Sequence, residues 1–203
     1  MTQRLFVIGM NKTGTRSLHQ LFKRSGYNAV HWDGGALART IDENIHAGRD
    51  PIAGYERYEV FLDMEGTYGQ PVTEAYRYFK EIYTAHPQAL FLLNYRDVDD
   101  WLYSKRLHGV KRHGYQIYLD YYKQHIRARS DEEVVRHWRR SYYEHTSNVL
   151  AFFENKPDSL VLFNLDRDTP EDLAERLRPQ FNIDPQHWAH VGRTTWRASG
   201  DRA

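Results

Sequence analysis

One stretch near the N-terminus places two glycines and a lysine in a spacing that could bind a phosphate-like anion. Gly9 and Gly14 are separated by four residues, as in the P-loop of nucleotide-binding proteins. In that pattern Lys and then Ser or Thr come directly after the second glycine, but here Thr15 and Arg16 follow it. Lys12 lies between the two glycines instead. The stretch predicts an anion site, and the alternative is a tight turn with Lys12 in solvent.

The departure from the P-loop pattern bears on which anion is bound. The residue after the P-loop lysine normally holds Mg²⁺ through its hydroxyl group, and the side chain of Arg16 has no such group. A sulfuryl group carries less charge than a γ-phosphoryl group and needs less metal, because Lys12 alone could neutralise the bridging oxygen of a leaving phosphate. We therefore predict a phosphosulfate-binding loop with Lys12 as a catalytic residue and without a metal site.

A second candidate for anion binding is Arg96, which follows the apolar run Ala89 to Tyr95. If this run is a strand, Arg96 leaves it at the carboxyl end, where open α/β sheets bind ligands. Its fixed charge and forked donors suit a phosphate group. The alternative is that Arg96 pairs with Asp97, Asp99 or Asp100.

These two stretches together resemble the sulfotransferases that use 3′-phosphoadenosine 5′-phosphosulfate. The sequence "NKTGTRSL" is similar to the family's motif for the 5′-phosphosulfate, and "NYRDVDDWLYSK" supplies the Arg and Ser of the motif for the 3′-phosphate. The stretches "HWRRSYYEHTSNVLAFF" and "LVLFNLDRDTPEDLAERL" extend the resemblance over most of the chain. It implies a P-loop-like fold, this nucleotide as co-substrate, and transfer of a sulfuryl group to a hydroxyl or amine.

The resemblance also implies which residues bind the nucleotide. Family members often have a C-terminal segment that closes over it, for which Arg193 and Arg197 are available here, although the same segment could equally be a frayed chain end. The residues expected at the nucleotide are Asn11, Lys12, Thr13, Gly14, Thr15, Arg16, Ser17, Arg96, Ser104 and Arg193.

The motifs leave open which residue accepts the proton of the acceptor. The family uses His in some branches and Glu in others, and three candidates come just after apolar runs, namely His31, Asp63 and Glu65. A carboxylate near an apolar strand end can have its pKa raised towards neutrality, and the ordinary pKa of His is already close to neutral. We favour Asp63 or Glu65 over His31. The alternatives are that His31 closes a turn and that Asp63 caps or hydrogen-bonds the loop.

Two other functions fit the same architecture. In a magnesium-dependent P-loop kinase, the Asp at the end of "VFLD" would assist the metal, but the displaced Lys12 and the pair Arg96 and Ser104 oppose this interpretation. A non-catalytic nucleotide sensor would keep the loop and need no base. For an enzyme, a small molecule, a glycan, a lipid or a protein side chain could be the acceptor, contacted by the segments 32–58 and 106–129.

Short apolar runs alternate with helical patterns along the chain, which is typical of βα units and a parallel sheet. Strands are expected over 5–9, 27–32, 60–63, 89–95 and 160–165, and helices over 15–25, 36–47, 72–84 and 130–153, through Trp101 and Lys105, and from Pro170. We therefore predict an α/β fold of three layers, with a central parallel sheet of four or five strands and a P-loop-like strand-loop-helix. A single domain over 1–203 is expected.

The composition limits the class of protein. The 203 residues, 40% hydrophobic and 27% charged, suffice for one ordinary core. The chain contains no cysteine, which excludes disulfides, thiolate zinc sites and cysteine nucleophiles. No stretch approaches the roughly 20 apolar residues of a membrane span, and the first apolar run is too short for a signal peptide. A cytoplasmic protein is expected.

The positive charge is concentrated in the segment 105–140, which holds ten Lys and Arg against four Asp and Glu. Four tyrosines, Tyr115, Tyr118, Tyr121 and Tyr122, lie among these residues. The pattern suits either an anionic ligand or a solvated helix face. Since the chain carries no recognised nucleic-acid-binding module, a nucleic-acid partner is not expected.

Overall fold

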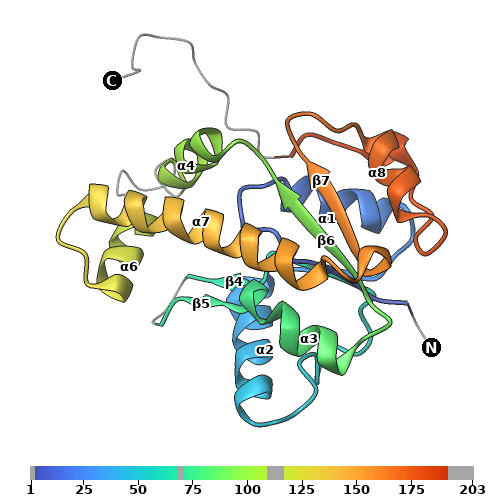
Figure 1. Cartoon of the computed structure of the whole chain (residues 1–203), viewed down its shortest axis with the longest axis horizontal. Helices are drawn as coiled ribbons and strands as arrows, with labels where there is room; N and C mark the ends of the chain where they lie inside the picture. The colour runs from blue at the N-terminus through green and yellow to red at the C-terminus, as the bar shows by residue number, and fades with distance from the viewer. Residues whose placement is uncertain (1–2, 68–70, 109–116, 192–203) are drawn as a thin grey trace.

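The computed structural model describes residues 3–67, 71–108 and 117–191, and at its centre is a five-stranded parallel sheet. The strands are β1 (Leu5–Val7), β2 (Ala29–His31), β3 (Val60–Leu62), β6 (Leu90–Tyr95) and β7 (Leu160–Asn164), in the order β2-β3-β1-β6-β7 (Figure 1). Every pairing between neighbours in this sheet is parallel. The predicted α/β fold with a parallel sheet of four or five strands is confirmed.

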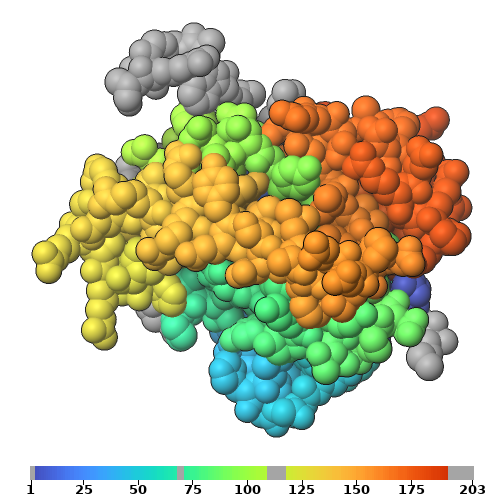
Figure 2. Space-filling model, in the orientation of Figure 1, coloured from blue at the N-terminus to red at the C-terminus, as the bar shows by residue number. Residues whose placement is uncertain are grey.

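Alternate residues of the central strands point to opposite faces of the sheet and join two hydrophobic cores. In β1, Leu5 and Val7 belong to one core while Phe6 belongs to the other. The first core lies under α1 (Thr15–Arg24) and α8 (Pro170–Leu177). The second lies under α2 (Ala36–His46), α3 (Phe79–Ala85), α4 (Val98–Arg106), α6 (Ile117–Ile126) and α7 (Asp131–Phe153). In Figure 2, α7 forms a band across the middle of the view, on the side of the sheet that carries the second core.

Two helices begin where their capping residues predict. Ser130 accepts a hydrogen bond from the backbone N–H of Glu133 at the start of α7. At the start of α8, Thr169 and Asp172 form a reciprocal capping box around Pro170, which occupies the first turn. No helix in the described ranges is long and apolar enough to cross a membrane.

The prediction of one helix over 72–84 is confirmed only for its second half, which is α3 (Phe79–Ala85), and is wrong for its first half. Thr73–Glu74 form the strand β5, which pairs antiparallel with β4 (Glu65–Gly66), and a 3-10 turn at Ala75–Tyr78 leads into α3. Pairing with a segment earlier in the chain overrides the local helical pattern, as tertiary context commonly does. The segment 105–140 contains α6, but its Tyr118 and Tyr122 are buried in the second core and do not form a solvated face.

Candidate active site

The predicted site residues gather at one edge of the sheet. Lys12 follows β1, His31 ends β2, Asp63 follows β3 and Arg96 follows β6. Because these strands are parallel, their carboxyl ends meet at the same edge, where α/β sheets bind ligands. The fold therefore brings together segments that lie far apart in the sequence.

The loop between β1 and α1 is fastened to β6 by the side chain of Asn94. Its Oδ1 accepts a hydrogen bond from the backbone N–H of Gly9 at 3.0 Å, and its Nδ2 donates to the backbone oxygen of Thr13 at 2.9 Å. A Cβ atom on Gly9 would lie only 2.0 Å from the backbone oxygen of Asn94. Gly9 is thus required by the approach of the strands, and Asn94 is a loop-shaping residue that the sequence interpretation missed.

The start of α1 lies at this sheet edge and has no side-chain cap in the described part of the chain. Its N-cap is Gly14, at φ 86°. Asp97 caps α4 and Ser130 caps α7, whereas α2 also begins at an uncapped glycine, Gly35 at φ 82°. The first turn of α1 contains no acidic residue and includes the exposed Arg16. Its backbone N–H groups and the positive end of the helix dipole therefore stay available to a phosphate-like group.

Backbone strain is concentrated at the same edge. Five non-glycine residues in the described ranges have a positive φ, and four of them, Lys12, Trp32, Asp33 and Asp63, follow the ends of β1, β2 and β3. Such conformations persist only where the surrounding structure enforces them, and they cluster at functional sites. Trp32, with φ 62° and ψ −50°, is a site-edge residue that no motif indicated.

Asp63 and His31 face each other at this edge. Nε2 of His31 lies 3.3 Å from Oδ2 of Asp63 and 3.2 Å from Oγ1 of Thr15. Burial raises the pKa of Asp63 to about 7, and the charge of Glu65 adds to the rise while Lys12 opposes it. Burial also lowers the pKa of His31 to about 4. At neutral pH the imidazole is therefore neutral, and Asp63 can exchange a proton.

Glu65 occupies a different environment, although it lies only two residues from Asp63. It is 2% exposed. Its Oε1 accepts hydrogen bonds from the hydroxyl groups of Tyr118 and Tyr122 and forms an ion pair with Nζ of Lys105 at 3.5 Å. The Asp63 side chain, in contrast, is 17% exposed. Of the two predicted carboxylates, Asp63 is the one that a substrate can reach.

Lys12 has a neighbour that the motifs did not indicate. Nδ1 of His108, just beyond α4, lies 3.5 Å from Nζ of Lys12. Burial, together with the charges of Lys12 and Lys105, lowers the pKa of His108 to about 4. The imidazole is neutral at pH 7, so it adds no positive charge beside Lys12 and offers its Nδ1 as an acceptor.

Arg96 lies where the second motif predicts, but it also has the acidic partners of the alternative interpretation. Its Nη2 is 3.4 Å from Oδ1 of Asp166 and 3.8 Å from Oδ2 of Asp100. Its Nε is buried and has no hydrogen-bond partner among the described residues. Ser104 lies on α4 and is buried. Arg96 thus keeps one donor for a phosphate while two carboxylates compete for another.

Ser17 connects the start of α1 to the last described residues. Its Oγ accepts a hydrogen bond from the backbone N–H of Val191 at 3.0 Å. The chain therefore returns to the start of α1 at this point. Arg193, expected at the nucleotide, lies outside the described residues.

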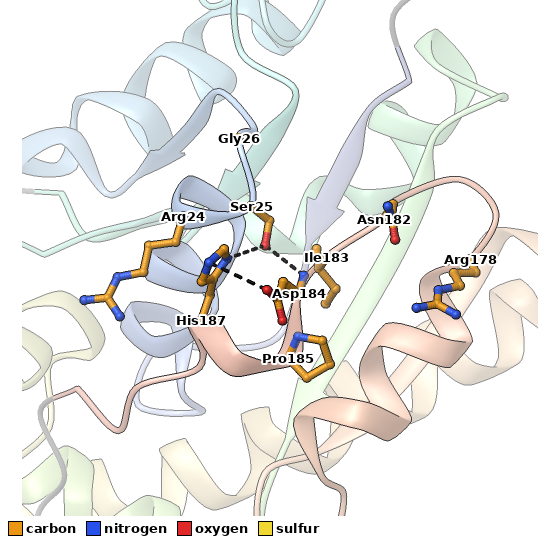
Figure 3. Close-up of a pocket in the computed structure, with 9 residues that line it drawn as sticks. All are labelled: Arg24, Ser25, Gly26, Arg178, Asn182, Ile183, Asp184, Pro185 and His187. Atoms are coloured by element: carbon orange, nitrogen blue, oxygen red, sulfur yellow. Dashed lines mark hydrogen bonds and ion pairs between the residues drawn. The ribbon is translucent and has the colours of Figure 1, made fainter.

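A cavity of about 490 Å³ lies at the other end of α1 and contains none of the predicted site residues (Figure 3). Oγ of Ser25 lies 3.3 Å from Nδ1 of His187, and Nε2 of the same ring lies 3.8 Å from Oδ2 of Asp184. A Ser-His-Asp set can activate a serine nucleophile. Here Ser25 is the C-cap of α1, where helix carbonyls oppose a developing negative charge, so the arrangement is unsuited to acyl transfer.

The described residues contain no group of three or more His, Asp or Glu side chains that could hold a metal ion. The strand-end Asp63 is engaged with His31 rather than with a second carboxylate directed at a common point.

Comparison with known proteins agrees with this geometry. The family model described as "Sulfotransferase domain" matches residues 4–178, which include the loop between β1 and α1, Asp63, Arg96 and Ser104. A search of curated proteins found no match. Since the matched residues run from the start of the first strand to the end of α8, the chain belongs to the sulfotransferase family and is an enzyme that transfers a sulfuryl group.

Proposed function

We propose that this enzyme transfers the sulfuryl group of 3′-phosphoadenosine 5′-phosphosulfate to a hydroxyl or amine, with Asp63 as the general base. The observation that carries the proposal is the juxtaposition of an uncapped helix start, the Lys12 ammonium and the Asp63 carboxyl group at one sheet edge. The first two suit the anionic donor, and the third suits the proton of the acceptor.

The donor groups of the chain suit this nucleotide. The first turn of α1 offers backbone N–H groups to the 5′-phosphosulfate, with Lys12 and the exposed Arg16 beside them. The unpartnered Nε of Arg96 suits the 3′-phosphate, and Ser104 follows it on α4. When bound, the nucleotide supplies the sulfuryl group and leaves as adenosine 3′,5′-bisphosphate.

Two side chains carry the chemistry in this proposal. Lys12 stabilises the negative charge that develops on the bridging phosphate oxygen as its bond to sulfur breaks. Asp63 takes the proton from the acceptor as the acceptor's oxygen or nitrogen forms its bond to sulfur. His31 orients Asp63 through Nε2, and its neutral ring does not compete with Lys12 for the donor. Glu65 is assigned no proton transfer, because it is buried and paired.

Calorimetry tests the donor half of the proposal. Adenosine 3′,5′-bisphosphate is expected to bind equally well with and without a chelator and more tightly than ATP with Mg²⁺. Strict metal dependence together with a preference for ATP would contradict the proposal. Lys12→Ala should lower turnover more than nucleotide affinity, because Lys12 acts on charge that appears during the transfer. Lys23→Ala is the matched control, because Lys23 is exposed and lies at the end of α1 that is far from the loop. It should change neither turnover nor nucleotide affinity.

An assay with labelled donor and a panel of acceptors tests the base. Asp63→Asn should lower turnover by at least about 10², the usual contribution of a positioned base, while the affinity for the bisphosphate changes little. Asp158→Asn is the control, because Asp158 is exposed and lies in the 3-10 turn Pro157–Ser159 before β7, at the opposite edge of the sheet. Full activity of Asp63→Asn with any acceptor in the panel would exclude Asp63 as the base.

A further inference from the structure

We propose that Tyr118 is a positioning residue, whose hydroxyl group joins the loop residue Asn11 to the buried carboxylate of Glu65 and thereby fixes the place of Lys12. The inference rests on the proposed function, because that function gives Lys12 its role. Tyr118 acts through Asn11 and Lys12, since its own hydroxyl group is already hydrogen-bonded to Asn11 and to Glu65.

The hydroxyl group of Tyr118 links the loop to the interior. It accepts a hydrogen bond from Nδ2 of Asn11 at 2.5 Å and donates one to Oε1 of Glu65. The direction of both bonds is set by chemistry, because an amide Nδ2 only donates and a carboxylate only accepts. Burial raises the pKa of Tyr118 well above its ordinary value, and the charge of Glu65 adds to the rise, so the hydroxyl group keeps its proton.

Glu65 is a fixed point for this link. Its partner Lys105 is 1% exposed, and Nζ of that lysine lies between 4.9 and 5.3 Å from the centres of four aromatic rings, those of Trp101, Tyr118, Tyr122 and Trp138. A buried ion pair enclosed in this way is costly to separate, because either charge would be left uncompensated. The carboxylate of Glu65 therefore holds one position, and Tyr118 transmits that position to the loop.

The loop needs such a support because Lys12 adopts the left-handed conformation, at φ 65°. This conformation is unfavourable for a residue with a Cβ atom and persists only when its neighbours enforce it. Asn11, the preceding residue, is held by Tyr118 through its side chain and by Nε1 of Trp101, which donates to its backbone oxygen at 2.8 Å. Loss of the Tyr118 hydroxyl would leave the buried Nδ2 of Asn11 without this partner and would loosen the backbone beside Lys12.

Tyr122 is a matched control on the same helix. It is as deeply buried as Tyr118, and its hydroxyl group also bonds to Oε1 of Glu65, at 2.8 Å. Its second carboxylate contact is Oε1 of Glu74, on β5, at 2.8 Å, so it faces away from the loop. Removal of either hydroxyl group takes one hydrogen bond from Glu65, but only Tyr118→Phe breaks the link to Asn11.

The experiment compares Tyr118→Phe with Tyr122→Phe by thermal unfolding, by calorimetry with adenosine 3′,5′-bisphosphate, and by turnover with labelled donor. Both variants keep the ring, and with it the packing of Tyr118 against His108. Tyr118→Phe should lower kcat by about 10-fold to 100-fold, the cost of a misplaced catalytic group, whereas Tyr122→Phe should stay within about threefold of the wild type. Equal kcat values for the two variants would overturn the positioning role.

A double-mutant cycle keeps the proposal testable even if both variants lose stability. Asn11→Ala removes the same link from the loop side, so the effects of Asn11→Ala and Tyr118→Phe on kcat should be strongly non-additive. Additive effects would overturn the link. Failure of the proposed function is distinguishable, since in that case the wild-type protein itself would bind no bisphosphate and sulfate no acceptor, whatever the variants do.

Discussion

At the scale of single residues, the structure raises the pKa of Asp63 to a value at which it can accept a proton near neutral pH. Burial and the charge of Glu65 bring its pKa to about 7, while His31 and His108, both near 4, stay neutral throughout the physiological range. One group at this edge therefore titrates near neutrality. The two histidines supply neutral imidazole rings, with His31 beside Thr15 and His108 beside Lys12.

The pKa of Asp63 predicts how turnover depends on pH. A general base must be ionised to accept a proton, so kcat/KM should rise with pH through about 7 and fall by about tenfold per pH unit well below it. Initial rates with labelled donor between pH 5 and 9 check this, and Asp158→Asn should keep the profile. A rate that stays flat between pH 5 and 8 would exclude Asp63 as the titrating base.

Asp63 should also reduce the stability of the protein at high pH. Its pKa in the folded protein, about 7, lies above its ordinary value of 3.8, so the stability that it contributes is present below pH 4 and lost as the pH rises through 7. Asp63→Asn removes the buried charge and should raise the Tm at pH 8 by at least about 2 °C. The gain should shrink towards pH 4. Thermal unfolding followed by circular dichroism measures this, and a lower Tm at pH 8 would contradict it.

The ion pairs of Arg96 predict an effect on nucleotide preference. Asp166, at 3.4 Å from the guanidinium, competes with a 3′-phosphate for Arg96. Asp166→Asn should therefore tighten the binding of adenosine 3′,5′-bisphosphate by about two- to fivefold, the range of a partly exposed ion pair, and leave adenosine 5′-monophosphate unaffected. Calorimetry with both nucleotides decides it. If the ratio of the two affinities does not change, Arg96 does not bind the 3′-phosphate in competition with Asp166.

At the scale of secondary-structure elements, the loop between β1 and α1 depends on how closely β1 approaches β6. The side chain of Asn94 holds this loop against β6, because it forms hydrogen bonds with the backbone of both Gly9 and Thr13. The two glycines have different reasons to be there. Gly9 leaves room for the backbone of Asn94, whereas Gly14 supplies a left-handed turn into α1.

Gly9→Ala should destabilise the protein by more than about 2 kcal/mol, because its Cβ atom would overlap the backbone oxygen of Asn94 at 2.0 Å. Gly26→Ala is the control, since a Cβ atom there meets nothing within 4 Å and only the positive φ of 92° opposes it. That substitution should cost about 1 kcal/mol. Urea unfolding compares the two. Equal losses would show that β1 can move away from β6 without difficulty.

The elements also show where local sequence patterns fail. The strands of the main sheet and the starts of α7 and α8 follow apolar runs and capping residues, which act within a few residues of chain. The first half of the segment 72–84 fails because Thr73 and Glu74 pair with β4, an interaction that no local pattern records. The basic, tyrosine-rich segment was open to two interpretations for the same reason. Tyr118 and Tyr122 are core residues, and Lys105 is paired inside the protein.

At the scale of the whole molecule, nucleotide binding should stabilise the entire fold, because the proposed site is formed by loops that follow β1, β3 and β6 in one sheet. At a concentration about a hundred times its Kd, adenosine 3′,5′-bisphosphate should raise the free energy of unfolding by about 2.7 kcal/mol. For a chain of this length that corresponds to a rise in Tm of roughly 5–10 °C. Differential scanning fluorimetry checks it, with Lys23→Ala as a control that should keep the shift. A shift that disappears with a chelator would favour a metal-dependent nucleotide instead.

Local sequence patterns are enough to predict the α/β architecture and to place Lys12, Asp63 and Arg96 after the ends of strands. These features follow from the period of apolar residues and from glycine spacing, which act along the chain. Which of the two carboxylates is accessible depends on tertiary packing, because Asp63 and Glu65 are similar side chains in similar local sequence and differ in what surrounds them. Glu65 is paired with Lys105 and accepts a hydrogen bond from Tyr118, and these two residues lie 40 and 53 residues away on α4 and α6. Burial and charge pairing depend on packing between distant segments, so only the folded chain separates the exchangeable carboxyl group from the structural one.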